Sequence, residues 1–295
     1  MRISKPIEGA LWMTGAAASL VAMALLVRFL TPQYNVLELI FLRNVVNLCL
    51  MIPWIVRTGL ASVRTERLGL HGFRNAIQYT GNLAWFYAVN MVTLAELSAL
   101  QFTMPIFTVV MAVIVLREKV DSPRLLVVAA GFVGTLIILR PDQITPGIGP
   151  FVVLAAAFFY SVGYITTKQL SATASANAVV FYMSVFILVF SAIPAAFVWQ
   201  TPDAADLPQI VGLGVTGYTT HYCVTRAMAS ADASFVVPFD FLRLPMSAAA
   251  GIVLFAEPLH NTTVIGAVVI FCAAYYNTRR EERRGRRGSG TGPAQ

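Results

Sequence analysis

The sequence predicts an all-α, polytopic membrane protein of ten transmembrane helices, built as two inverted five-helix repeats. The composition, the number of apolar runs and a similarity between the two halves of the chain support this prediction. Of the 295 residues, 57% are hydrophobic and only 12% carry a charge. A water-soluble domain of this length needs more polar residues to cover its surface. The protein is therefore expected to lie in a lipid bilayer.

Apolar runs long enough to cross a bilayer recur along the whole chain. The hydrocarbon core is about 30 Å thick and requires roughly 20 apolar residues per helix. The first run follows Arg2 and Lys5, as a secretory signal would, but it continues past residue 25 without a clean cleavage pattern. We therefore interpret it as the first span. The predicted spans are 8–29, 35–56, 70–92, 94–116, 122–140, 149–169, 177–199, 207–229, 232–256 and 260–278.

The basic residues predict how these spans are oriented. Ten spans place both ends of the chain on one side, and basic residues collect on the cytoplasmic side. If the N-terminus is cytoplasmic, Arg28 and Arg140 lie outside, Arg43 and Arg243 lie within the membrane, and every other Lys and Arg lies inside. We expect a multi-pass protein of the cytoplasmic (inner) membrane with cytoplasmic N- and C-termini.

The last segment, 279–295, reads "RREERRGRRGSGTGPAQ" and differs from the rest of the chain in composition. Its charge and its Gly and Ser content predict a disordered basic cytoplasmic tail. A solvated anchor that fixes the orientation explains this charge more simply than binding of nucleic acid or of a specific lipid. We expect no nucleic-acid partner.

An internal repeat emerges when the chain is shifted against itself by about 140 residues. "GALWMTGAAASLVAMALLVRFL" from Gly9 then matches "GPFVVLAAAFFYSVGYITTKQL" from Gly149. Because five spans per half is an odd number, the halves must be inverted relative to each other, as in many secondary transporters. Pro53 falls over Pro194, Pro105 near Pro245, Glu118 over Glu257, and Arg140 over Arg279. The predicted domains are a first repeat, 1–142, a second repeat, 143–278, and the tail, 279–295.

Four further segments carry a family resemblance that covers essentially all ten spans. They are "FLRNVV", "QFTMPIFTVVMAVIVLREKV", "AGFVGTLIILRP" and "FLRLPMSAAAGIVLFAEPL". The chain resembles the EamA-type carriers of the drug/metabolite transporter superfamily. "HGFRNAIQYTGNLAWFYAVNMVTLAELSALQFTMPIFT" is most similar to the branch of S-adenosylmethionine uptake carriers, with riboflavin carriers and amino-acid exporters as relatives. The resemblance implies a central cavity lined by the first, third, fourth, sixth, eighth and ninth helices.

Polar residues at helical spacing independently predict the lining of a solute site. Lipid-facing positions should be apolar, so polar groups within a span should face the bundle interior or water. Residues three, four and seven apart lie on one helix face, and such stripes occur in the third, sixth and eighth spans. Together they would form an aromatic cage with amide, imidazole and ionic groups, suited to a planar or zwitterionic solute. The candidate binding residues are Gln78, Asn82, Trp85, Gln101, Tyr160, Tyr164, His221, Tyr222, Asp240 and Arg243.

The ninth span carries a charged pair within an otherwise apolar run. At about 1.5 Å per residue, Asp240 and Arg243 lie near the middle of the bilayer core. Their i, i+3 spacing lets the two side chains meet, and Pro238 and Pro245 free nearby carbonyls. The first half offers Gln101 in place of Asp240. We expect the ninth helix to carry the charged side of the site and to exchange its ion pair for contacts to a zwitterionic solute.

Each candidate also has a purely structural interpretation. Amides and tyrosines often bond one membrane helix to another, Trp85 could belong to an interfacial belt, and His221 could be a buried hydrogen-bonded residue instead of a proton relay. Arg43 lies in the second span, which the resemblance places outside the lining. We interpret it as a partner for backbone carbonyls or a carboxylate.

The motifs favour transport over other functions. The chain has no HExxH, GxSxG or GxxxxGK[ST] motif, and its three cysteines form no disulfide framework or metal site, so we expect no enzyme, no cofactor and no metal. We predict a secondary transporter that moves a small organic metabolite by alternating access. Its expected substrate is S-adenosylmethionine or a similar zwitterionic or aromatic solute. A riboflavin or amino-acid carrier, a non-transporting scaffold and a homodimer all remain open.

Overall fold

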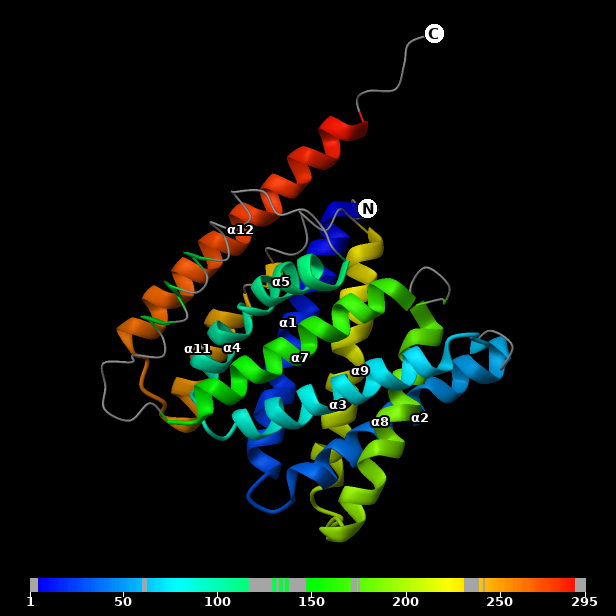
Figure 1. Ribbon diagram of the computed structural model, residues 1–295. Coiled ribbons are helices and arrows are strands. Elements are labelled where there is room, and N and C mark those ends of the chain that lie inside the picture. Colours follow the sequence, from blue (N-terminus) through cyan, green and yellow to red (C-terminus); the bar gives the residue numbers. More distant parts are fainter. Residues whose placement is uncertain are drawn as a thin grey trace.

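The computed structural model describes residues 5–59, 63–116, 129–130, 133–134, 136–137, 147–170, 174, 176–230, 239–240 and 242–289. Within these residues the regular structure is helical, and no strand occurs (Figure 1). The helices are α1 (Lys5–Leu30), α2 (Val36–Thr58), α3 (Leu68–Ala88), α4 (Leu94–Gln101), α5 (Met104–Leu116), α7 (Gly149–Leu170), α8 (Ala176–Phe197), α9 (Leu207–Ser230), α11 (Arg243–Phe255) and α12 (Asn261–Ser289).

Four stretches among the described helices are long and apolar enough to cross a membrane. They are Ile7–Leu30, Val36–Thr58, Gly149–Thr167 and Ala178–Phe197, and shorter apolar stretches occupy Arg243–Phe255 and Asn261–Ala273. The outer surface of the bundle is also apolar, with large exposed side chains such as Val56, Ile193 and Phe197. Such a surface is stable against lipid and unstable against water.

The observed helices follow the predicted spans closely, with three differences. Helix α3 ends at Ala88, before the predicted end at residue 92, because the chain turns there toward α4. The fourth predicted span, 94–116, is two helices, α4 and α5. Helix α12 continues to Ser289, so the part of the predicted disordered tail up to that residue is helical. Most of the fifth predicted span, and the first part of the ninth, lie outside the described residues.

A proline and a tight turn mark the break between α4 and α5. Pro105 has no backbone N–H to continue the ladder, and the chain forms tight i→i−3 bonds instead, from Phe102 to Ala99 and from Thr103 to Leu100. Helix α4 begins with a capping box in which Thr93 and Glu96 bond each other's backbone N–H groups. Helix α4 is therefore a short, separately capped element.

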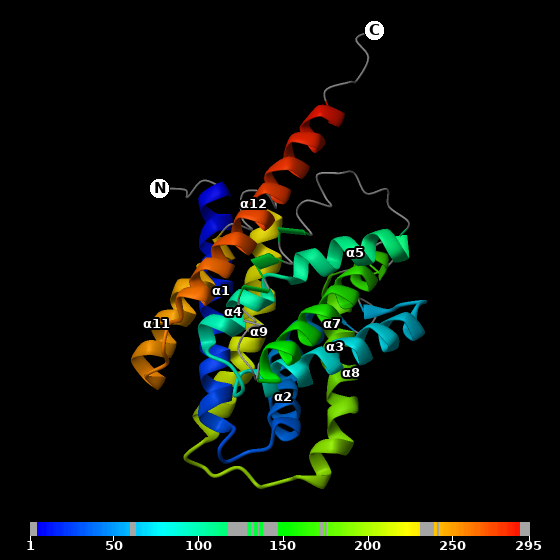
Figure 2. The ribbon, with the colours of Figure 1, turned by 60° about the vertical axis from the view of Figure 1, so that its left-hand side comes forward.

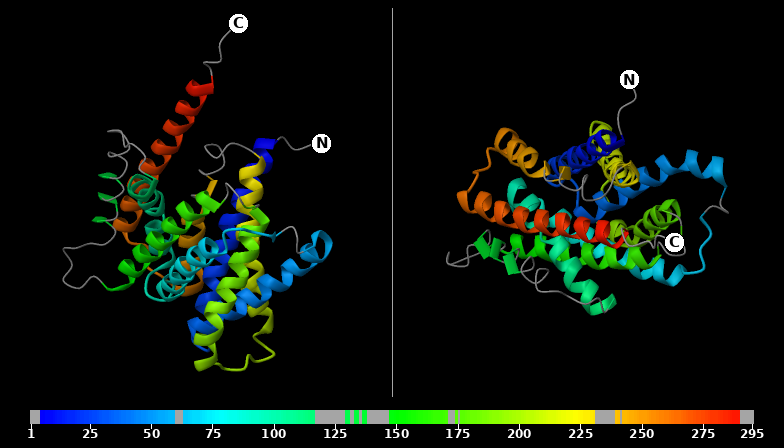
Figure 3. Two further views of the ribbon diagram at one scale, coloured as in Figure 1. Left: turned by 45° about the vertical axis from the view of Figure 1, so that its right-hand side comes forward. Right: turned by 90° about the horizontal axis from the view of Figure 1, so that it is seen from above.

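The bundle is organised by long helix pairs (Figures 2 and 3). Helix α1 packs along α9, α3 packs along α7, and α2 packs against α8 and α9. Glycines permit close approach: a side chain at Gly214 would collide with Val46 of α2, and one at Gly81 would meet the Tyr160 ring of α7 at 2.9 Å. Helix α4 lies against α11 and α7. Helix α1 begins and α12 ends toward the same end of the bundle (Figure 1).

Candidate solute-binding site

The first group of predicted site residues meets between α3 and α7. The Tyr160 hydroxyl donates to Asn82 Oδ1 at 3.1 Å. One turn earlier on α3, the Gln78 side chain reaches α7 beside Gly163. The i, i+4 spacing of Gln78 and Asn82 gives both amides the same face. The structure thus brings three of the predicted residues together across one helix pair.

The second group meets where α4 crosses α11. Arg243 begins α11 and is buried; its Nη2 lies 3.5 Å from Asp240 Oδ2, and its Nη1 donates to Gln101 Oε1 at 3.3 Å. The guanidinium also lies over the Phe102 ring, 4.7 Å from its centroid. Asp240 keeps about a third of its side chain exposed. The ion pair and the amide expected from the sequence therefore form one cluster.

One predicted residue on α3 and one on α9 have different surroundings. Trp85 is buried in the hydrophobic core and packs edge-on against Phe86. Tyr222 is exposed, stacks with Tyr218, and meets Trp12 of α1 edge-on. These rings form an aromatic surface along α1 and α9. The Tyr164 side chain lies outside the described part of the structure.

His221 of α9 is exposed, whereas Tyr160 of α7 is partly buried. His221 interacts electrostatically with Arg43 and Arg74, which come from α2 and α3.

Arg43 of α2 belongs to the bundle interior, although the sequence places it among structural residues. It is 7% exposed, its Nη1 lies 4.0 Å from Met23 Sδ, and its Cζ lies 5.0 Å from the Phe86 ring centroid. It also interacts electrostatically with Tyr160. In the sequence, its distinguishing feature is its depth in an apolar span.

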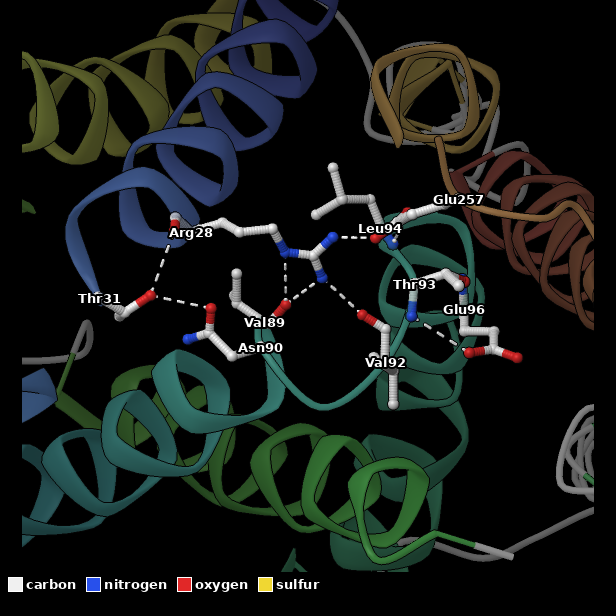
Figure 4. A network of polar contacts seen from close by, with 9 residues as sticks. All are labelled: Arg28, Thr31, Val89, Asn90, Val92, Thr93, Leu94, Glu96 and Glu257. Carbon is white, nitrogen blue, oxygen red and sulfur yellow. Dashed lines mark hydrogen bonds and ion pairs between the residues drawn. The ribbon is translucent and has the colours of Figure 1, made fainter. Parts of the chain in front are cut away.

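A separate polar network lies at the end of α1, where this helix meets the α3–α4 turn (Figure 4). Arg28, at the end of α1, pairs with Glu257 and donates to the carbonyl oxygens of Val89 and Val92. Glu257 also accepts the backbone N–H of Leu94 at 2.8 Å. The network joins α1, the α3–α4 turn, the first residue of α4 and the turn before α12. We call it the Arg28 network.

No group of three or more metal-ligating side chains that could hold an ion occurs within the described residues. The interior contains a carboxylate–arginine–amide cluster, a hydroxyl–amide pair and aromatic rings. These groups can hydrogen-bond and stack with a small organic molecule.

Comparison with known proteins identifies the family. The profile of the EamA-like transporter family matches the chain twice, over residues 7–140 and 147–279. The chain belongs to the EamA-like transporter family. It is therefore a transporter and a multi-pass membrane protein.

Relatives of this EamA transporter include carriers named for two solutes. A riboflavin transporter of Vibrio cholerae is 28% identical over 96% of each chain. A riboflavin transporter of Brucella anthropi is 31% identical, covering 82% of this chain and 87% of its own. An S-adenosylmethionine uptake transporter of Rickettsia bellii is 28% identical, covering 84% and 86%. A solved crystal structure shares the fold with a TM-score of 0.65 at 16% identity, over 93% of this chain and 98% of that one.

Proposed function

We propose that this EamA transporter carries a small zwitterionic or aromatic metabolite across the cytoplasmic membrane by alternating access between two inverted halves. S-adenosylmethionine is the first candidate, because relatives are named for its uptake and the interior combines charged, amide and aromatic groups. Riboflavin is the second, since other relatives are named for it. The Asp240–Arg243–Gln101 cluster carries this proposal, because charges within a membrane bundle are costly unless they serve a pathway.

The helix packing supports ten crossings in two inverted repeats, 1–142 and 143–278. In an inverted repeat, α1 corresponds to α7, α2 to α8, α3 to α9, and α5 to α11. If each helix is replaced by its counterpart in the other half, the α1–α9 contact becomes α7–α3, the α2–α9 contact becomes α8–α3, and the α5–α7 contact becomes α11–α1. Each of these three contacts and its counterpart occurs in the structure. The site would then lie between the halves, as in other inverted-repeat carriers, with both termini in the cytoplasm.

Uptake into proteoliposomes tests this function. Purified protein should accumulate labelled S-adenosylmethionine or riboflavin above empty vesicles, and the better solute should compete with the other. Asp240→Asn should reduce that uptake to background, because it removes the only carboxylate that pairs with Arg243 among the described residues. Glu66→Gln, at an exposed position before α3, is the matched control and should transport normally. Unchanged uptake by Asp240→Asn would exclude the proposed site.

A further inference from the structure

Arg43 is a buried arginine in the interior of the transporter. It lies seven residues into α2, or about 10 Å along a helix that rises about 1.5 Å per residue. Gly217 of α9 makes room for it: a side chain there would come within 3.3 Å of Arg43 Cδ. The arginine therefore lies where α1, α2, α3 and α9 meet, in the interior of the bundle.

The contacts of Arg43 do not balance its charge. In the described part of the chain, no carboxylate approaches its guanidinium, and its Nε donor has no hydrogen-bond partner. The methionine sulfur at 4.0 Å is a weak acceptor, and the Phe86 ring offers only its face. A buried guanidinium is costly unless it is paired and hydrogen-bonded.

The other described arginines of the interior and the bundle ends each have a carboxylate or a side-chain oxygen as a partner, although Arg243 Nε, like Arg43 Nε, has none. Arg28 pairs with Glu257, Arg243 with Asp240, and Arg226 with Glu8. Arg74 donates to Thr167 at 3.1 Å and to Asn75 at 2.7 Å. Arg43 therefore differs from arginines that hold the bundle together, and its surroundings already contain groups of the candidate site, Tyr160 and His221.

We propose that Arg43 binds an oxyanion group of the transported solute, a carboxylate or a phosphate. This inference rests on the proposed function and narrows its substrate class. A guanidinium presents paired N–H donors that match the two oxygens of such a group. The aromatic rings nearby suit a planar part of the same molecule. Among the two kinds of relatives, S-adenosylmethionine carries a carboxylate and riboflavin carries no oxyanion, so the proposal favours the first.

Binding measurements on the purified full-length protein test this inference with two probe pairs. S-adenosylmethionine is compared with its decarboxylated analogue, and flavin mononucleotide with riboflavin; the pairs distinguish a carboxylate from a phosphate. In at least one pair, the anionic member should bind about tenfold to a hundredfold more tightly, as expected for charge-assisted hydrogen bonds. Arg43→Gln should remove that difference, and Arg43→Lys should restore part of it.

Arg57→Gln is the matched control, because Arg57 lies in the last turn of the same helix and is exposed. It should leave the preference for the anionic probe unchanged. The inference is overturned if no anionic probe binds, or if the preference persists in Arg43→Gln. Riboflavin uptake that Arg43→Gln does not alter would also overturn it, while leaving the carrier function intact.

Discussion

Arg28 lies on α1 and Arg43 on α2, and both helices pack against α9. Both side chains are largely buried, yet their surroundings differ. Arg28 meets a carboxylate and two backbone carbonyl oxygens. Arg43 meets a thioether and an aromatic face. Where every donor has an acceptor, the charge holds protein segments together. Where the described residues supply no acceptor, as at Arg43, the charge can bind a ligand, as we propose.

Replacing Arg28 should give the largest loss of stability. Arg28→Met leaves the Glu257 carboxylate and two carbonyl oxygens without their partner, and breaking a buried pair costs about 3–5 kcal/mol. The side chains of Arg28 and Glu257 are 13% and 14% exposed, so we expect the lower end of that range. The free energy of unfolding in detergent measures it.

The Arg226–Glu8 pair supplies the control for this experiment. Its two side chains are 47% and 38% exposed, so solvent screens the pair. Arg226→Met should cost less than about 1 kcal/mol. Equal losses for the two variants would mean that the Arg28 network does not stabilise the bundle beyond an ordinary surface pair.

Replacing Arg43 should have a smaller effect on stability, either none or a slight gain. Arg43→Met substitutes an apolar side chain for a buried charge without a described counterion, which is neutral or stabilising by about 1 kcal/mol. The same denaturation measurement compares it directly with Arg28→Met. A destabilisation as large as that of Arg28→Met would assign Arg43 a structural role.

The sequence predicted most helices but not the break in the fourth span. Span length follows from bilayer thickness, so runs such as 149–169 and 207–229 agree with α7 and α9 within a few residues. A proline in an apolar run, by contrast, is compatible with a kink or a break. The outcome at Pro105 depends on tertiary contacts of α4 with α7 and α11, which the sequence does not contain.

Some contacts among the candidate site residues were predictable to a similar extent. The offset of about 140 residues relates Gln101 to Asp240, and in the structure both lie against Arg243. Helical spacing placed Asn82 on a face that meets Tyr160. The sequence suggests a structural role for Arg43. It shows how far this residue lies from the ends of its span, but not which side chains surround it.

Gly217→Ala should perturb anion binding without a comparable loss of stability. The added methyl group would lie 3.3 Å from Arg43 Cδ, and a flexible side chain can yield by a few tenths of an ångström. The guanidinium would shift, so affinity for the anionic probe should fall several-fold. Gly212→Ala on the same helix is the control, because its methyl group would meet Leu26 at 3.3 Å. An equal effect of both variants would attribute the change to α9 packing instead of Arg43.

The smallest effect is expected at the Ser98–Ser247 hydrogen bond between α4 and α11. The hydroxyl oxygens lie 2.7 Å apart in a buried position, but such bonds between membrane helices contribute on average about 0.6 kcal/mol. A double-mutant cycle with Ser98→Ala and Ser247→Ala should return a coupling energy of that size, and a cycle between Arg28 and Glu257 one several times larger.

The Arg28 network and this serine pair hold the same two elements, since Glu257 bonds the first residue of α4 just after α11 ends. A carrier that alternates access must separate such elements at one end while its interior contacts rearrange at little cost. A strong network at the turn and a weak hydrogen bond within the bundle fit that requirement. A serine coupling as large as the Arg28–Glu257 coupling would instead indicate that α4 and α11 move as one rigid unit.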